Sequence, residues 1–281
     1  MSKKKRNIFL LVWFCLLALL IVGIILTNTG ESKSESLSEA MRDAVLHEEN
    51  VISLFGLKNV NPAVISGFTV TAVLLLFAAV VRIFVIPRFK RVPGKFQMLL
   101  EAAVGFFDNL AKTNSPHRNK FLGAYIFGAG VYIFIGTLFE LFGLQATTIH
   151  GHTIALPAPL SDINAAIALR FVSYFVIMSG GIAENGLKGV GSTLKEFSLP
   201  ISMSFRLFGA LLSGLLVTEL VYYTLSLSVV LPVVVAVLFT LLHALVQTYV
   251  LTLLTSIYYG EVSEPHEKKP KKSKKIKQAK A

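Results

Sequence analysis

Long apolar runs constrain this chain more than any other feature, because each is long enough to cross a lipid bilayer. Residues 8–27 carry no charged side chain, and residues 67–86 carry only Arg82. About twenty apolar residues in a helix span a hydrocarbon core of roughly 30 Å. The chain is 54% hydrophobic and 15% charged, whereas soluble domains are about one quarter charged. The sequence therefore indicates an integral membrane protein.

Basic residues mark one side of the membrane. They precede the first run, follow the second at Arg88, Lys90 and Arg91, and fill the C-terminal tail. The positive-inside rule then predicts that both termini are cytoplasmic. Six spans fit this pattern: residues 8–27, 67–86, 121–144, 163–182, 200–225 and 231–259. For the first run, a removed signal peptide is the alternative to an uncleaved anchor.

The predicted fold is an all-α membrane protein with about six membrane helices. Two of them form a long C-terminal helical hairpin, and an amphipathic surface helix occupies residues 96–112 because apolar residues recur there at helical spacing. We divide the chain into an N-terminal membrane anchor at 1–30, an external polar segment at 31–66, a channel-like membrane domain at 67–262 and a basic cytoplasmic tail at 263–281.

Several function classes find no support in the sequence. The net charge of +11 is gathered in short segments that flank apolar runs, which is not the basic face of a nucleic-acid-binding protein. The single cysteine, Cys15, has no partner. There is no P-loop, H-E-x-x-H or nucleophile elbow. We expect no catalytic site, metal or cofactor.

Arg206 lies in an apolar stretch rich in small residues, about one and a half turns after Pro200. Snorkelling to the headgroups is one interpretation. The other is a fixed charge at a close helix contact, since Gly209, Ser213 and Gly214 keep the helix narrow. Arginine does not deprotonate in proteins, so this position suits an encounter with a carboxylate.

Further polar residues lie on the last two helices. Glu219 follows Arg206 by thirteen residues, which is about 220° around a regular helix and roughly 20 Å along it. Thr240, His243 and Gln247 are spaced three and four apart and form one polar stripe. A buried histidine is commonly only hydrogen-bonded, but beside Glu219 we interpret His243 as part of a proton relay.

The third and fourth spans carry four more candidates. Glu140 and Arg170 are each a few residues from the outer ends of antiparallel helices, so we expect a structural ion pair. Asp162 and Asn164 stand where the fourth span begins and are typical capping residues.

Several segments of the sequence resemble subunit a of the F-type ATP synthases. Residues 202–214, "SMSFRLFGALLSG", are similar to that family's S-L-R-L-F-G-N-M-x-A-G segment, and "ALVQTYVLTLLTSIYYGE" is similar to its last helix. "VPGKFQMLLEAAVGFF", "ELFGL" and "SDINAAIAL" match three earlier segments in order.

The resemblance implies the stator channel of a rotary motor, in which two half-channels carry protons or sodium ions to and from ring carboxylates. Arg206 then matches the arginine that meets that carboxylate, and Gln247 the nearby glutamine. Asp162 and Asn164 become a candidate channel mouth. The implied partners are the c-ring, peripheral-stalk b subunits and the catalytic head, in a bacterial cell membrane.

The sequence also departs from the family pattern. Leu215 and Thr240 occupy the usual relay positions, whereas Glu219 and His243 stand one turn beyond them. We interpret this joint shift as a relocated relay. The alternatives are a secondary transporter with a buried arginine for an anionic substrate, and a structural membrane subunit. A transporter is expected to show two related halves with broken helices, and none is evident.

Overall fold

The computed structural model describes residue 18 and residues 52–54, 57–147, 153–195, 197–223 and 231–265. Three predictions lie wholly or largely outside these residues. They are the anchor at 1–30, the external segment at 31–66 and the basic tail at 263–281. The first span at 8–27, apart from residue 18, and the link at 224–230 also lie outside them.

The first described membrane helix starts earlier than the apolar run suggested. Helix α3 (Pro62–Val80) begins at Pro62, because Asn61 accepts a hydrogen bond from the Ala63 N–H at 2.9 Å and proline suits the first helical position. It continues through η1 (Val81–Val85) and η2 (Ile86–Arg88). The resulting span, Pro62–Arg88, ends at the first of the clustered basic residues.

Helix α4 (Lys95–Asn114) is the predicted amphipathic helix. Phe107 and Ala111 are buried on one face, whereas most of its other side chains are exposed. Phe107 fits against helix α5 (Lys120–Leu138) at Gly130, where a Cβ would lie 2.7 Å from the phenyl ring. Glycine at this position therefore permits α4 to pack closely on α5.

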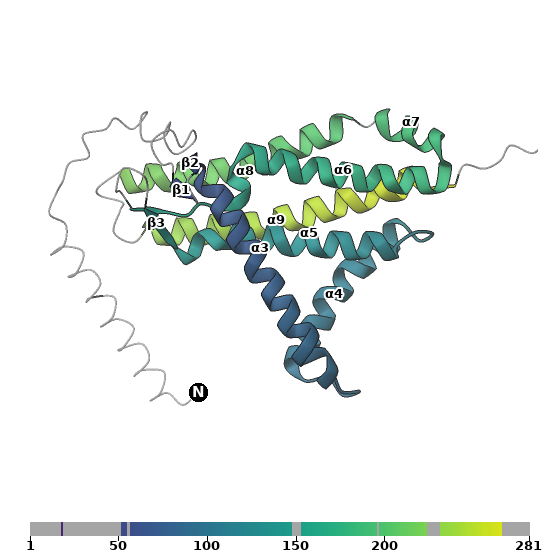
Figure 1. Ribbon diagram of the computed structural model, residues 1–281, viewed down its shortest axis with the longest axis horizontal. Helices are drawn as coiled ribbons and strands as arrows, with labels where there is room; N and C mark the ends of the chain where they lie inside the picture. Colours follow the sequence, from purple (N-terminus) through teal and green to yellow (C-terminus); the bar gives the residue numbers. More distant parts are fainter. Residues whose placement is uncertain are drawn as a thin grey trace, which may run out of the picture.

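Four helices form the main bundle. Helices α5, α6 (Ile163–Asn185), α8 (Ser198–Tyr223) and α9 (Leu231–Val262) run side by side, while α3 and α4 project from them and meet in a corner (Figure 1). A short helix between α6 and α8, α7 (Leu187–Lys195), was not predicted. Helix α7 and the first part of α8 are bent by 45° across a short break.

Short strands modify the all-α prediction. Strand β1 (Ile52–Leu54) pairs antiparallel with β2 (Leu57–Val60), and β3 (Gln145–Thr147) pairs antiparallel with β4 (Thr153–Ala155). Between β4 and α6, a 3-10 turn, η4 (Pro159–Ser161), packs among the helices. The protein is thus mostly helical, with two small hairpins near one end of the bundle (Figure 1).

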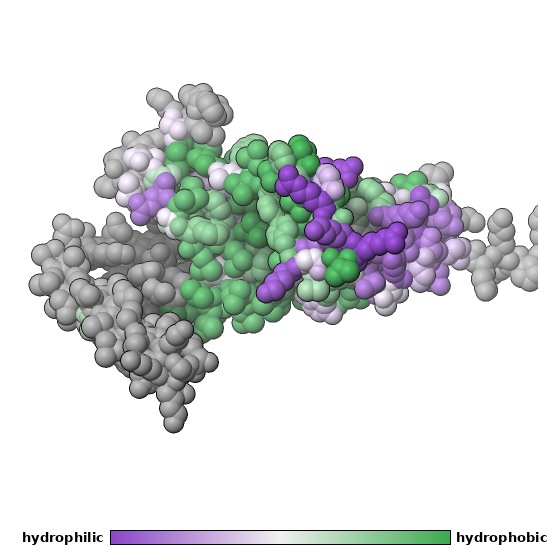
Figure 2. All heavy atoms as spheres, turned by 90° about the horizontal axis from the view of Figure 1, so that it is seen from below, coloured by the Kyte–Doolittle hydropathy of each residue, from purple (hydrophilic) through white to green (hydrophobic). Residues whose placement is uncertain are grey.

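The structure confirms that the protein is mostly helical and has several helices that could cross a membrane. Within the described residues, four helices are long and apolar enough to cross a membrane, or five if α7 and α8 form one bent span. Six spans stay a prediction, because all but one residue of the first run lie outside the described residues. Hydrophobic side chains cover a broad surface of the bundle, as a lipid-facing exterior requires (Figure 2).

Candidate functional site

Arg206 lies on an exposed, narrow face of α8. Ser202, Gly209 and Ser213 share this face and are also exposed, whereas Met203 and Leu207 on the other side are buried. Arg206 forms no ion pair with another described residue. A Cβ at Gly209 would meet nothing within 4 Å. The helix therefore presents a charged side chain flanked by small residues on a surface that the described residues leave uncovered.

A second arginine lies nearby in the interior. Arg170 on α6 is 2% exposed, and its Nε and Nη1 have no hydrogen-bond partner among the described residues. Its guanidinium lies within electrostatic range of Tyr125 and of Arg206. Tyr125 in turn is hydrogen-bonded to Ser173 at 2.7 Å. The structure thus places two permanent positive charges near one another within the membrane bundle.

The expected ion pair between Glu140 and Arg170 is not formed. Glu140 is half-buried in the 3-10 turn η3 (Phe139–Phe142) and does not pair with Arg170. The Tyr125–Ser173 hydrogen bond sets the register of the antiparallel helices α5 and α6. Arg170, three residues before Ser173, is therefore level with about residue 128 of α5, twelve residues or about 18 Å from Glu140.

The turn that precedes α6 explains this difference in depth. The Pro159 ring in η4 packs at Gly136, where a Cβ would lie 3.6 Å from the ring. Helix α6 therefore begins closer to the middle of the bundle than Glu140 does. Arg170 lies two helical turns further along α6, and so deeper still. The pattern of apolar residues does not predict this inward start.

The polar stripe on α9 is confirmed as a structural feature. Thr240 and Gln247 are buried and His243 is half-buried. His243 faces the narrow part of α8, since a Cβ at Gly214 would lie 3.3 Å from its Nδ1. Glu219 is on α8, one and a half turns beyond Gly214, but its side chain is outside the described part of the chain.

Sequence reasoning missed most of a second row of polar groups on α9. Thr248, Thr252, Thr255 and Ser256 are buried, and the Thr252 hydroxyl donates to the Thr248 carbonyl at 2.8 Å. The Thr255 hydroxyl has no partner among the described residues. Positions 248, 252 and 256 are four apart, so helical spacing of hydroxyls was a signal that could have revealed the row.

Asp162 caps α6, as its sequence position predicted. Its side chain accepts hydrogen bonds from the Asn164 N–H at 3.0 Å and from the Asn164 amide at 3.2 Å. These contacts satisfy an otherwise unpaired N–H in the first turn. The structure therefore gives both residues a structural role, and their place at a channel mouth stays a prediction.

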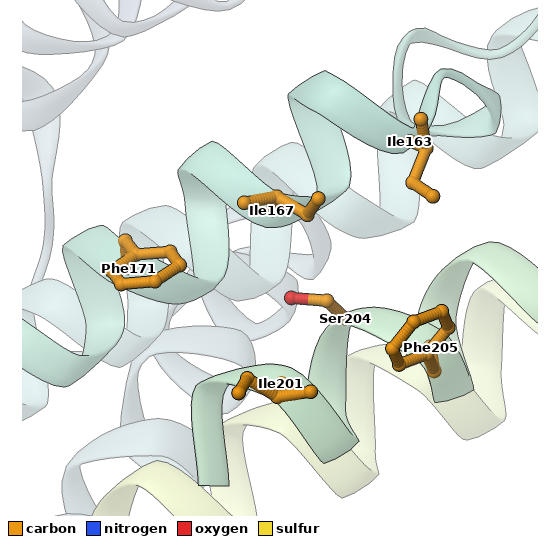
Figure 3. A pocket seen from close by; sticks show the side chains of 6 residues that line it. All are labelled: Ile163, Ile167, Phe171, Ile201, Ser204 and Phe205. Atoms are coloured by element: carbon orange, nitrogen blue, oxygen red, sulfur yellow. The ribbon is translucent and has the colours of Figure 1, made fainter. Parts of the chain in front are cut away.

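A small pocket lies between α6 and α8 but carries no charge. It has a volume of about 90 Å³ and is lined by five apolar side chains and Ser204 (Figure 3). The Ser204 hydroxyl donates to the Pro200 carbonyl at 2.6 Å. This pocket therefore offers no group that would bind an anionic substrate, which counts against the transporter alternative at this position.

Helices α5, α8 and α9 meet in a core that includes Leu207, next to Arg206, and Leu251, one turn beyond Gln247. The fold and this site define a class of protein. It comprises helical membrane proteins that carry an arginine on an exposed helix face, with no ion-pair partner among the described residues, beside a largely buried polar stripe on the neighbouring helix. The particular family follows from comparison. The chain belongs to the ATP synthase A chain family, whose model matches residues 64–260.

The matched residues run from the first turn of α3 to the last turn of α9 and include Arg206, His243 and Gln247. Members of this family are the proton-conducting stator subunits of the Fo sector. They translocate ions and have no catalytic site of their own. Family membership thus decides between the open alternatives in favour of the stator channel.

Proposed function

We propose that Arg206 is the fixed cation past which the rotor carboxylates turn. The observation that carries this proposal is the exposed face of α8, where Arg206 has no partner among the described residues and Gly209 leaves open space. An unpaired charge in a membrane is costly, so it implies a partner other than the described residues of this chain. A ring of small subunits, each with one membrane carboxylate, supplies that partner.

The chemistry of Arg206 follows from its permanent charge. A nearby cation lowers the pKa of a carboxyl group and so drives an arriving, neutral ring carboxyl to release its proton. The released proton leaves by one half-channel, and a proton from the other half-channel neutralises the carboxylate after it has passed. Because arginine does not deprotonate, Arg206 also prevents a direct proton leak between the two paths.

We assign the α8–α9 interface to one half-channel. His243 at Gly214 and the buried Gln247 are polar groups in an otherwise apolar hairpin, and Glu219 follows Gly214 by five residues in the sequence of α8. Such groups sustain proton transfer where ordinary packing residues would not. Asp162 and Asn164 would stand at the mouth of the other path.

Arg170 is buried beside this site. A buried guanidinium with two unpartnered groups is expected to hold water or an anion, since leaving it dry would cost several kcal/mol. We propose that water in a half-channel solvates Arg170 and that its charge adds to the positive field around Arg206.

The partners and the location are proposed on the same basis. The chain works with the c-ring, peripheral-stalk b subunits and the catalytic head, in a bacterial cell membrane. The basic end of α3 faces the cytoplasm by the positive-inside rule, and both termini lie on that side. The membrane potential contributes about 2.3 kcal/mol per charge per 100 mV to rotation.

The test is ATP-driven acidification of inverted membrane vesicles. Arg206→Ala should abolish pumping while the ring and the head still co-purify with the chain. The matched control is Arg82→Ala, which removes an exposed arginine from η1, the continuation of α3. Pumping at the wild-type rate in Arg206→Ala would refute the assignment, and an equal loss in Arg82→Ala would show that the effect is not specific.

A further inference from the structure

The corner where α3 meets α4 carries a dense cluster of cations. Residues 81–100 contain five basic residues and no acidic one. All five are exposed, and none forms an ion pair with another described residue: Arg82, Arg88, Lys90, Arg91 and Lys95. Like charges held this close repel one another, so the cluster indicates a surface that receives an anion.

Three of these cations line one groove. The groove has a volume of about 420 Å³, and its principal lining side chains are Arg88, Lys90, Lys95, Phe84, Phe89 and Phe96. In the view from the side of this corner, hydrophilic side chains gather next to a wide hydrophobic surface (Figure 2). The groove thus combines positive charge with aromatic walls.

Gln97 holds one edge of the groove in place. Its amide accepts from the Lys90 N–H at 3.1 Å and donates to the Lys90 carbonyl at 3.0 Å. Glu101 accepts a further hydrogen bond from the same amide at 2.7 Å. These contacts tie the loop that carries Lys90 to the first turn of α4, so the cations are set in position before a ligand arrives.

The depth of the groove matches that of lipid headgroups. The membrane span Pro62–Arg88 ends where the groove begins. From there an apolar strip leads along α3 into the membrane, with Phe77, Val80 and Phe84 each 50 to 54% exposed. A ligand with a phosphate at one end and acyl chains at the other would contact both features.

We propose that this groove binds the headgroup of an anionic glycerophospholipid in the leaflet that the Arg88 end of α3 faces. The phosphate lies among Arg88, Lys90 and Lys95, and the acyl chains run along the exposed side of α3. An acidic segment of a partner protein would satisfy the charges but would leave the apolar strip uncovered. The combination of charge and apolar surface therefore favours a lipid.

The experiment measures lipid preference in the whole complex. The ATP synthase is reconstituted into bilayers with spin-labelled phosphatidylglycerol or phosphatidylcholine, and the immobilised fraction of each gives their relative association. The groove variant changes Arg88, Lys90 and Lys95 to Gln. We expect its preference for phosphatidylglycerol to fall by up to about 100-fold at that class of site, given the attraction of each basic residue near a membrane.

The matched control removes the same charge elsewhere. It changes Lys112, Lys120 and Lys195 to Gln, three exposed lysines that do not line the groove. This variant should keep the wild-type preference. An unchanged preference in the groove variant, or an equal loss in the control, would overturn the proposal. Loss of a partner subunit from the groove variant without a change in lipid preference would identify a protein ligand instead.

A second variant distinguishes a site with positioned side chains from a general attraction between a basic surface and anionic lipids. Gln97→Ala keeps every cation and removes the hydrogen bonds to Lys90, together with the one to Glu101 within α4. We expect it to lower the preference for phosphatidylglycerol severalfold, because the Lys90 loop would no longer be held in position. A wild-type preference for phosphatidylglycerol in Gln97→Ala would refute the proposal that the Gln97 hydrogen bonds position the groove for a lipid. The proposal does not depend on the role of Arg206, since the readout is lipid association and not proton pumping.

Discussion

Replacement of Gly209 by valine tests whether the Arg206 face of α8 meets a moving partner. Gly209 lies three residues after Arg206, and a Cβ there would contact none of the described residues within 4 Å. Within the subunit the change should be nearly neutral, because valine and glycine differ by only about 0.5 kcal/mol in helix propensity. Any large effect of Gly209→Val must therefore arise outside this chain.

The expected effect follows from packing at the rotor. Added methyl groups in a well-packed contact cost about 1 to 3 kcal/mol, and each ring subunit must pass them. Since about 1.4 kcal/mol in a barrier changes a rate tenfold, rotation should slow by about 5- to 150-fold. Both ATP-driven acidification of inverted vesicles and the coupled ATP hydrolysis of the same vesicles should slow together.

The control is Gly128→Val on α5, where a Cβ likewise meets nothing within 4 Å. It makes the same chemical change in a membrane helix away from the Arg206 face. ATPase activity of the head released from the membranes should be normal for both variants. Wild-type pumping in Gly209→Val, or an equal loss in Gly128→Val, would refute the view that this face of α8 borders the rotor.

Two further predictions concern the polar path. Glu219→Leu should leave the complex assembled but severely reduce passive proton flux through Fo, because the relay beside His243 would be broken; normal flux in stripped vesicles would remove Glu219 from the path. Arg170→Met should reduce pumping without lowering the unfolding temperature of the complex, since the cost of burying a guanidinium that has two groups without a partner among the described residues disappears. A lower unfolding temperature with full pumping would instead make Arg170 a purely structural residue.

Much of the candidate site could be predicted from the sequence of individual helices. Helical spacing alone placed Thr240, His243 and Gln247 on one stripe, and the structure buries two of them and half-buries the third. Small residues near Arg206 predicted a close helix contact, and Gly214 does face His243. Local chemistry also identified the cap at Asp162. These features depend on the period of a helix or on groups a few residues apart, which the sequence contains directly.

The relative depth of two helices, unlike the spacing of residues along one helix, could not be predicted from the sequence. Apolar runs predicted that Glu140 and Arg170 would meet, because both lie near helix ends, and this was wrong. The Tyr125–Ser173 hydrogen bond and the packing of Pro159 at Gly136 place Arg170 well inside the bundle instead. The sequence by itself determined the apolar spans, the polar faces and the family. Only the tertiary structure decided the register between helices, because register depends on how side chains from distant segments fit together.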